Sequence, residues 1–179
     1  MCIRDRGIAK IRRIKREIRV LGIASKPRGS LQTVVGVVYR GSLWLDGVLA
    51  INLRGDEASP TIRVAEMILE SSHHPQIRVI LLHRELLRGV RIDPYRLHLE
   101  VERPVIALSG DGGWPERREE AYSIGFEMEI GGERLKVLSI GLRSREAASI
   151  LKVATREGEK LPEALRVAGL IASALDQKT

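Results

Sequence analysis

Few side chains in this sequence have the chemistry needed for catalysis or metal binding. His83 ends a short apolar run, and Glu85 and Asp93 follow it. Asp46 stands directly before Gly47. An imidazole with two carboxylates can bind a transition metal, so His83, Asp46 and Glu85 form one candidate reactive group. Each carboxylate is isolated in the sequence, so solvation or a salt bridge is the simpler interpretation. For Asp46, a turn or bulge residue before Gly47 is favoured over a ligand.

Two other patterns give weaker signals. His73 and His74 are adjacent and precede Pro75, which predicts an exposed turn rather than a metal site. The glycine-rich stretch 109–113, SGDGG, could cradle a phosphate with its backbone N–H groups. Its spacing matches neither a phosphate loop nor a dinucleotide fingerprint, so we interpret it as a plain connecting loop.

The single cysteine, Cys2, lies in the first six residues, MCIRDR. This hexapeptide resembles the translation of a sequencing-adapter end, so residues 1–6 are expected not to belong to the natural protein. The remaining chain then has no cysteine, which excludes disulfides, thiol catalysis and thiolate metal sites. Setting aside the two arginines and one aspartate of this segment changes the formal net charge from +7 to +6.

The charge balance of the chain favours a polyanionic partner. Lysine and arginine number 30 against 23 aspartates and glutamates, which indicates nucleic acid first and an anionic membrane surface second. Aromatic residues make up only 3%, too few for a platform that stacks single-stranded bases. The alternative is a thermophile-type surface of paired charges. Residues 7–16 form a basic lead-in, interpreted as a solvated terminus or, alternatively, an arm on nucleic acid.

Three consecutive strands near the N-terminus organise the rest of the chain. Runs rich in β-branched residues span Ile18–Ile23, Thr33–Tyr39 and Leu43–Leu53, and turn residues at 26–30 and 40–42 separate them. The first run is apolar except for Arg19, which predicts a central strand buried on both faces.

The remaining sequence predicts an α/β sheet of mixed strand direction. Ile77–His83 and Pro104–Leu108 are short apolar runs typical of buried parallel strands, and a hairpin is expected around Gly131 and Gly132. Helices are expected to begin near Ser59, Pro94, Glu116, Ser144 and Pro162, with hydroxyl caps at both serines. This order matches a ribonuclease H-like layout, in which parallel strands extend three antiparallel ones and helices cover both faces.

The length and the hydropathy pattern predict one domain over residues 17–177. No apolar run approaches the ~20 residues of a membrane helix. Of the two polyanions that the charge favours, nucleic acid is the expected partner and a membrane is not. No secretory signal is visible, and the expected compartment is the cytoplasm.

Five segments together carry a resemblance to a known family. They are RVLGI at 19–23, VVGVVYRG at 34–41, WLDGVL at 44–49, RVILLH at 78–83 and LPEALRVAGLIASAL at 161–175. They resemble an archaeal family known as domain of unknown function ninety-nine, or endonuclease dU, which is related to endonuclease V within the ribonuclease H-like superfamily. The resemblance implies descent from a Mg²⁺-dependent endonuclease that acts on deaminated DNA in DNA repair.

The resemblance also implies where a metal site would stand. The family has Gly-Ile-Asp-Asp at the end of its first strand, Leu-Asp-Gly at the end of its fourth, and a histidine after Val-Ala in its last helix. The matching positions here are Ala24 with Ser25, His83, and Gly169. Alanine and glycine offer no ligand atom, serine replaces a carboxylate poorly, and a histidine beside Arg84 is unfavourable for Mg²⁺. A degraded metal site is therefore expected, with no cofactor for this chain, although intact members use Mg²⁺.

Three functional hypotheses follow from these patterns. The first is a nucleic-acid-binding family member, with DNA expected before RNA, whose contacts include Lys26 and Arg28 after the first strand and Arg84 and Arg88 after the fourth. The second is a non-catalytic interaction subunit, acting as a homodimer or beside an intact paralogue. The third is an enzyme rewired around the histidine and carboxylates described above.

Overall fold

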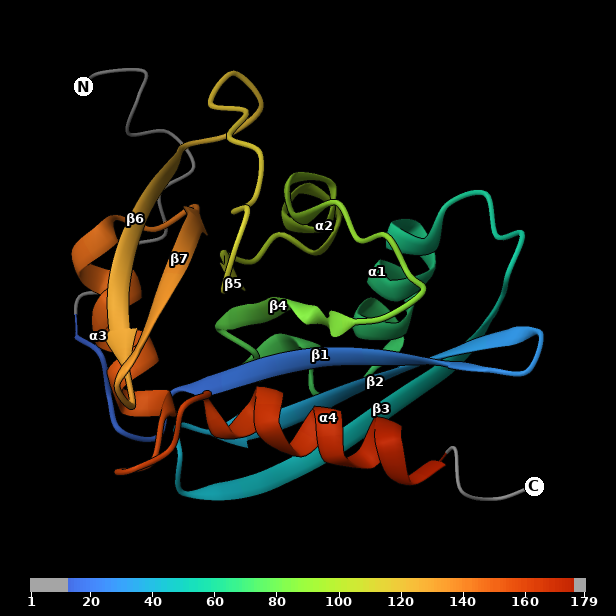
Figure 1. Cartoon of the computed structure of the whole chain (residues 1–179), viewed down its shortest axis with the longest axis horizontal. Helices are drawn as coiled ribbons and strands as arrows, with labels where there is room; N and C mark the ends of the chain where they lie inside the picture. The colour runs from blue at the N-terminus through green and yellow to red at the C-terminus, as the bar shows by residue number, and fades with distance from the viewer. Residues whose placement is uncertain (1–12, 176–179) are drawn as a thin grey trace.

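The apolar first strand lies near the middle of a seven-stranded sheet in the computed structural model, which describes residues 13–175. The adapter-like hexapeptide and residues 7–12 of the basic lead-in lie outside the described residues. The sheet has the order β3-β2-β1-β4-β5-β7-β6 (Figure 1). Its strands are β1 (Arg19–Arg28), β2 (Leu31–Arg40), β3 (Trp44–Arg54), β4 (Val79–Leu87), β5 (Val105–Ser109), β6 (Ser123–Ile130) and β7 (Glu133–Ile140).

Strand directions follow the expected layout. β1 pairs antiparallel with β2 and parallel with β4, and β4 pairs parallel with β5. The prediction that the apolar runs Ile18–Ile23 and Ile77–Leu82 lie side by side is confirmed. Apart from Arg19 and Arg78 near their starts, both runs are buried on both faces, because helices cover the sheet on each side. The predicted hairpin is also confirmed, with Gly131 and Gly132 joining β6 to β7 at positive φ.

Helices on both faces produce two separate apolar clusters. One face carries α1 (Pro60–Glu70) and α2 (Pro94–Val101), and the other carries α3 (Ser144–Ala154) and α4 (Glu163–Leu175). Figure 1 shows α1 and α2 together on one side of β1 and α4 along the other. A short 3-10 turn, η2 (His74–Gln76), leads into β4. Within residues 13–175 no helix combines the length and apolarity required to span a membrane.

Side chains along β4 alternate between these two clusters. Val79 and Leu81 pack in the cluster of α3 and α4, whereas Ile80 and Leu82 pack in the cluster of α1 and α2. This alternation is that of a strand buried on both faces. It places the next residue, His83, on the face covered by α3 and α4.

Four local predictions were wrong or only partly right. β1 continues through Arg28, so the first turn is shorter than 26–30; ladder pairing with β2 overrides the turn residues. Residues 116–122 form no helix, because Arg117 is held by contacts with α2. α1 begins after Ser59, but the serine makes no side-chain capping bond, and Ser144 is the first residue of α3 rather than its cap.

Candidate functional site

The carboxyl ends of β1 and β4 meet at a break in the sheet. The two strands pair in register up to Ile23 with Leu82, and the next pair is Ser25 with Leu87. Residues 83–86 of β4 therefore bulge out of the ladder opposite the single residue Ala24. Bulges of this kind redirect side chains at the edge of a functional site.

The three sequence positions that match the family's functional groups converge beside this bulge. Ala24 belongs to the apolar cluster shared with α4. His83 pairs with Leu108, which is in the same cluster, so the histidine lies on the same face. A Cβ added at Gly169 in α4 would lie 3.2 Å from Cδ2 of Leu86. The expected positions thus come together between β1, β4 and α4.

The interior of this junction is apolar. Ala24 is only 1% exposed and packs in the cluster that includes Leu165 and Ala168, and the half-buried Leu86 packs against the same cluster. The hydroxyl of Ser25 donates a 3.0 Å hydrogen bond to the carbonyl oxygen of Arg88, which ties β1 to the segment after β4. Across the described residues, no three His, Cys, Asp or Glu side chains are grouped to hold a metal ion.

His83 serves as a link between β4 and the glycine-rich stretch. Nδ1 of its buried ring lies 2.7 Å from Oε2 of Glu85 and 3.3 Å from the backbone nitrogen of Glu85, and Oε1 of Glu85 accepts the N–H of Gly110 at 3.2 Å. Burial lowers the pKa of His83, against the opposing charges of Glu85 and Glu133. The lowered pKa favours the neutral imidazole at physiological pH, and Nδ1 is occupied by its contacts with Glu85.

Asp46 lies at the opposite end of β1. Its carboxylate accepts from Nε of Arg19 at 2.8 Å and from Nε of Arg40 at 2.9 Å, and it is the extra residue of a bulge between β2 and β3. Although partial burial opposes them, these hydrogen bonds hold the pKa of Asp46 below its ordinary value. Ala24 follows Arg19 by five residues, roughly 16 Å along a strand. The structure therefore does not bring Asp46 to His83.

The adjacent histidines lie near the turn η2, half-buried rather than exposed. Nε2 of His74 lies 3.1 Å from the carbonyl oxygen of Val101, and the ring of His73 fills the space over Gly47. Both rings therefore have packing roles, which differs from the expected exposed turn.

Basic side chains frame the end of β1 and β4. Lys26 and Arg28 lie in the last part of β1, Arg84 lies in the bulge, and Arg88 directly follows β4. The three arginines are exposed. Because Ser25 pairs with Leu87, the two groups leave neighbouring strands at the same edge. This edge can attract a phosphate backbone.

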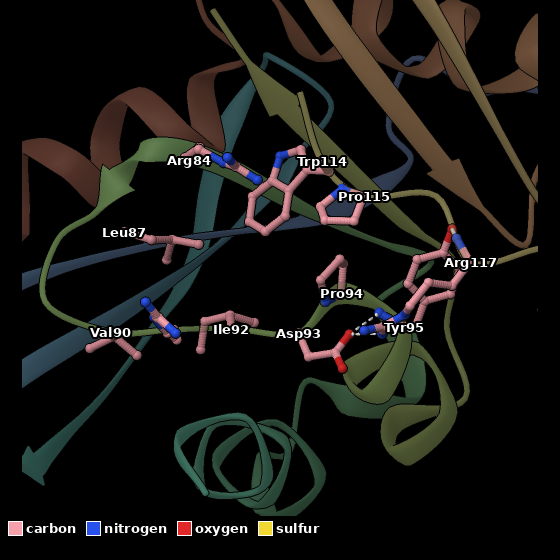
Figure 2. A pocket seen from close by; sticks show the side chains of 11 residues that line it. Arg84, Leu87, Val90, Ile92, Asp93, Pro94, Tyr95, Trp114, Pro115 and Arg117 are labelled. Carbon is pink, nitrogen blue, oxygen red and sulfur yellow. Dashed lines mark hydrogen bonds and ion pairs between the residues drawn. The ribbon is translucent and has the colours of Figure 1, made fainter. Parts of the chain in front are cut away.

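A cavity of about 610 Å³ opens between the end of β4, the start of α2 and the segment 114–117. Figure 2 shows Arg84 lying against Trp114 on one side, with Asp93, Tyr95 and Arg117 grouped on another. The guanidinium carbon of Arg84 lies 4.7 Å from the centre of the Trp114 ring, and that of Arg117 lies 4.7 Å from the centre of the Tyr95 ring. Both arginines are thus held by aromatic faces.

Asp93 has two structural roles beside this cavity. Its carboxylate caps α2 by accepting the backbone N–H groups of Tyr95 and Arg96. It also forms an ion pair with Arg117.

The sequence analysis missed Tyr95, Trp114 and Arg117 as site residues. The available signal was a tryptophan inside a polar stretch rich in glycine and arginine.

A family model described as Endonuclease dU matches residues 16–176. The chain belongs to the endonuclease dU family. The UPF0215 protein of Methanopyrus kandleri is 36% identical over 187 residues, covering 92% of this chain and 94% of its own length.

Solved structures show that this family member has the fold of endonuclease V. A protein of unknown function from Archaeoglobus fulgidus superposes with a TM-score of 0.72 at 24% identity, covering 89% of this chain and 98% of its own. Endonuclease V of Ciona intestinalis, in complex with a 24mer DNA containing an inosine followed by a ribo-adenosine, superposes with a TM-score of 0.61 at 13% identity, covering 89% and 86%. The predicted α/β, ribonuclease H-like layout is confirmed.

The side chains of this endonuclease dU family member do not fit a Mg²⁺ site at the family's positions. Mg²⁺ prefers carboxylate and water oxygens in octahedral geometry. The junction offers instead the methyl group of Ala24, the side chain of Leu86 over Gly169, and a histidine whose Nδ1 is occupied by contacts with Glu85. No reaction step through a metal follows from this donor set.

Proposed function

We propose that this endonuclease dU family member binds nucleic acid, DNA in preference to RNA, at the edge where β1 and β4 end. By this proposal it descends from a nuclease on deaminated DNA and has lost the metal site that hydrolysis needs. The observation that carries the proposal is the apolar filling of the junction, where Leu86 lies against Gly169 and Ala24 is buried. Retained function is then expected from the exposed arginines beside it.

The rival interpretation, a non-catalytic interaction subunit, requires an exposed apolar patch at the same edge. Within the described chain, three of the large apolar side chains exposed on the sheet lie on the far edge strand β3, namely Trp44, Leu45 and Val48, and one, Leu31, pairs with Arg28 at the end of β1. The end of β1 and β4 carries exposed arginines instead. This distribution favours the binding of a polyanion over a protein partner at the proposed site.

The proposal predicts steep salt dependence of DNA binding. Each neutralised phosphate contributes a slope of about −0.9 in log K against log salt for duplex DNA, and a handful of contacts gives roughly −3 to −6. Gel-shift titrations against duplex DNA, single-stranded DNA and RNA at several salt concentrations measure this slope. The double variant Arg28→Gln, Arg88→Gln is expected to make the slope shallower by about 2.

A charge-matched control separates local contacts from net charge. Arg78→Gln with Arg145→Gln removes two exposed arginines at the opposite end of the sheet, one directly before β4 and one in α3, and should leave the slope unchanged. The absence of binding to all three nucleic acids at low salt would favour the interaction subunit. Efficient Mg²⁺-dependent cutting of uracil- or inosine-containing DNA would show that the ligands lie elsewhere.

A further inference from the structure

The cavity beside α2 has the composition of a site for a small anion with a flat apolar part. Its charged lining consists of Arg84, Arg91, Arg117 and a single carboxylate, Asp93. Because Asp93 already accepts from the α2 N-terminus and pairs with Arg117, it neutralises only part of this positive charge. The remaining lining is apolar or aromatic and comprises Leu87, Val90, Ile92, Pro94, Tyr95, Trp114 and Pro115.

The two stacked arginines are positioned before any ligand arrives. Arg84 rests on the ring of Trp114, whose Nε1 donates a 2.8 Å hydrogen bond to the carbonyl oxygen of Leu108. Arg117 rests on Tyr95, and its backbone N–H donates to the Tyr95 hydroxyl at 2.7 Å. A guanidinium held in this way loses little freedom when its planar fork binds a phosphate.

We propose that this cavity binds one unpaired nucleotide, as a free nucleoside monophosphate or as a terminal nucleotide of a strand. Its phosphate lies at Arg84 and Arg91, and its base lies between the Trp114–Pro115 side and the Ile92–Pro94 side of the opening in Figure 2. The volume of about 610 Å³ is within the range of roughly 300–1,000 Å³ usual for small-molecule sites. A base pair within a duplex cannot enter such a cavity without leaving its stack.

This site is separate from the junction of β1, β4 and α4. Trp114 packs against the apolar cluster of α1 and α2, whereas Ala24 belongs to the cluster on the opposite face of the sheet. Arg84 and His83 are adjacent in β4 and, by strand alternation, belong to opposite faces. The proposal therefore goes beyond strand binding at the edge, and either can hold without the other.

Tryptophan fluorescence provides a direct assay. The chain has two tryptophans, so Trp44→Phe leaves Trp114 as the sole reporter. Titration of this variant with AMP should change the fluorescence saturably, whereas adenosine and inorganic phosphate should bind much more weakly. Adding Arg84→Gln should weaken AMP binding about tenfold or more, because a hydrogen bond to a charged group is lost.

Arg118→Gln is the matched control, since it removes one exposed arginine next to Arg117 that does not line the cavity. It should change AMP affinity less than about twofold. Competition with a single-stranded oligonucleotide distinguishes the two ligand sources: displacement of AMP assigns the site to a strand end, and no displacement assigns it to a free nucleotide. No AMP binding, equal binding of adenosine, or equal losses in both variants would each overturn the proposal. Because Arg84 belongs to both sites, DNA gel shifts on the Arg28→Gln, Arg88→Gln variant, whose changed residues do not line the cavity, report separately on the edge formed by β1 and β4.

Discussion

Replacing Gly22 with alanine is expected to destabilise the protein by forcing α4 away from β1. Gly22 lies in the buried part of β1, where the backbone of α4 crosses it. A Cβ at this position would lie 2.5 Å from the carbonyl carbon of Ala164 and 2.7 Å from the backbone nitrogen of Leu165. The shorter distance is about 0.9 Å below the 3.4 Å at which ordinary contact begins, and backbone atoms cannot rotate aside.

The magnitude follows from the rigidity of these neighbours. Inserting a methyl group into a packed core costs roughly 1–3 kcal/mol, and a clash with helix backbone belongs at the upper end, about 3 kcal/mol. Gly36 on the neighbouring strand β2 provides the control. A Cβ there would meet Cδ1 of Leu21 at 3.1 Å and Cβ of Leu49 at 3.5 Å, and the leucine end can move. Gly36→Ala is therefore expected to cost about 1 kcal/mol or less.

Urea unfolding followed by circular dichroism measures both effects. With a slope near 2 kcal/mol per molar urea, the midpoint of Gly22→Ala should fall by about 1.5 M and that of Gly36→Ala by at most about 0.5 M. Equal midpoints for the two variants, or a Gly22→Ala midpoint within about 0.3 M of wild type, would refute the close approach of α4 to β1.

Two further predictions concern buried polar groups. The hydrogen bonds from Arg166, at 2.8 Å, hold the pKa of the buried Glu163 below its ordinary value. Its stabilisation is therefore present above the unfolded-state pKa of about 4.3 and disappears as the pH falls through the folded-state pKa. Thermal melts should show wild type more stable than Glu163→Gln at pH 7 and equal to it at strongly acidic pH; a constant gap would contradict this reasoning. Tyr95→Phe removes the hydroxyl shared with Ser123 and the N–H of Arg117, and should cost about 1–2 kcal/mol in urea unfolding, whereas an unchanged midpoint would exclude this network as a source of stability.

The sheet could be predicted because its central strands carry their signal locally. The runs Ile18–Ile23 and Ile77–Leu82 are apolar except for Arg19 and Arg78, and near-continuous apolar runs are typical of strands covered by helices on both faces. The segment 116–122 was misread because its charged residues suit an exposed helix. Its conformation is decided by Arg117, whose partners Tyr95 and Asp93 are distant in sequence. Local helix propensity contains no information about contacts with residues that are distant in sequence.

Only part of the candidate site could be predicted from the sequence, for a related reason. Motif matching identifies Ala24, His83 and Gly169, and strand order brings them together. Nothing in the sequence indicates that Leu86 fills the space between them, because its position depends on the four-residue bulge of β4. The same bulge turns Arg84 toward Trp114 and helps to form the cavity. A break in ladder register depends on how two strands pair, so it cannot be predicted from the sequence of one strand alone.

The packing of α4 on β1 has a consequence for biosynthesis. Among the described elements β1 comes first and α4 comes last along the chain, yet the backbone of Ala164 covers Gly22 directly. During translation, α4 cannot cover the apolar face of β1 and β4 until it has left the ribosome. Contacts between such distant segments form late, and an exposed sheet face favours aggregation. A nascent chain that stalls before residue 163 would therefore be a substrate for chaperones and proteases, even though every strand of the sheet has already been synthesised.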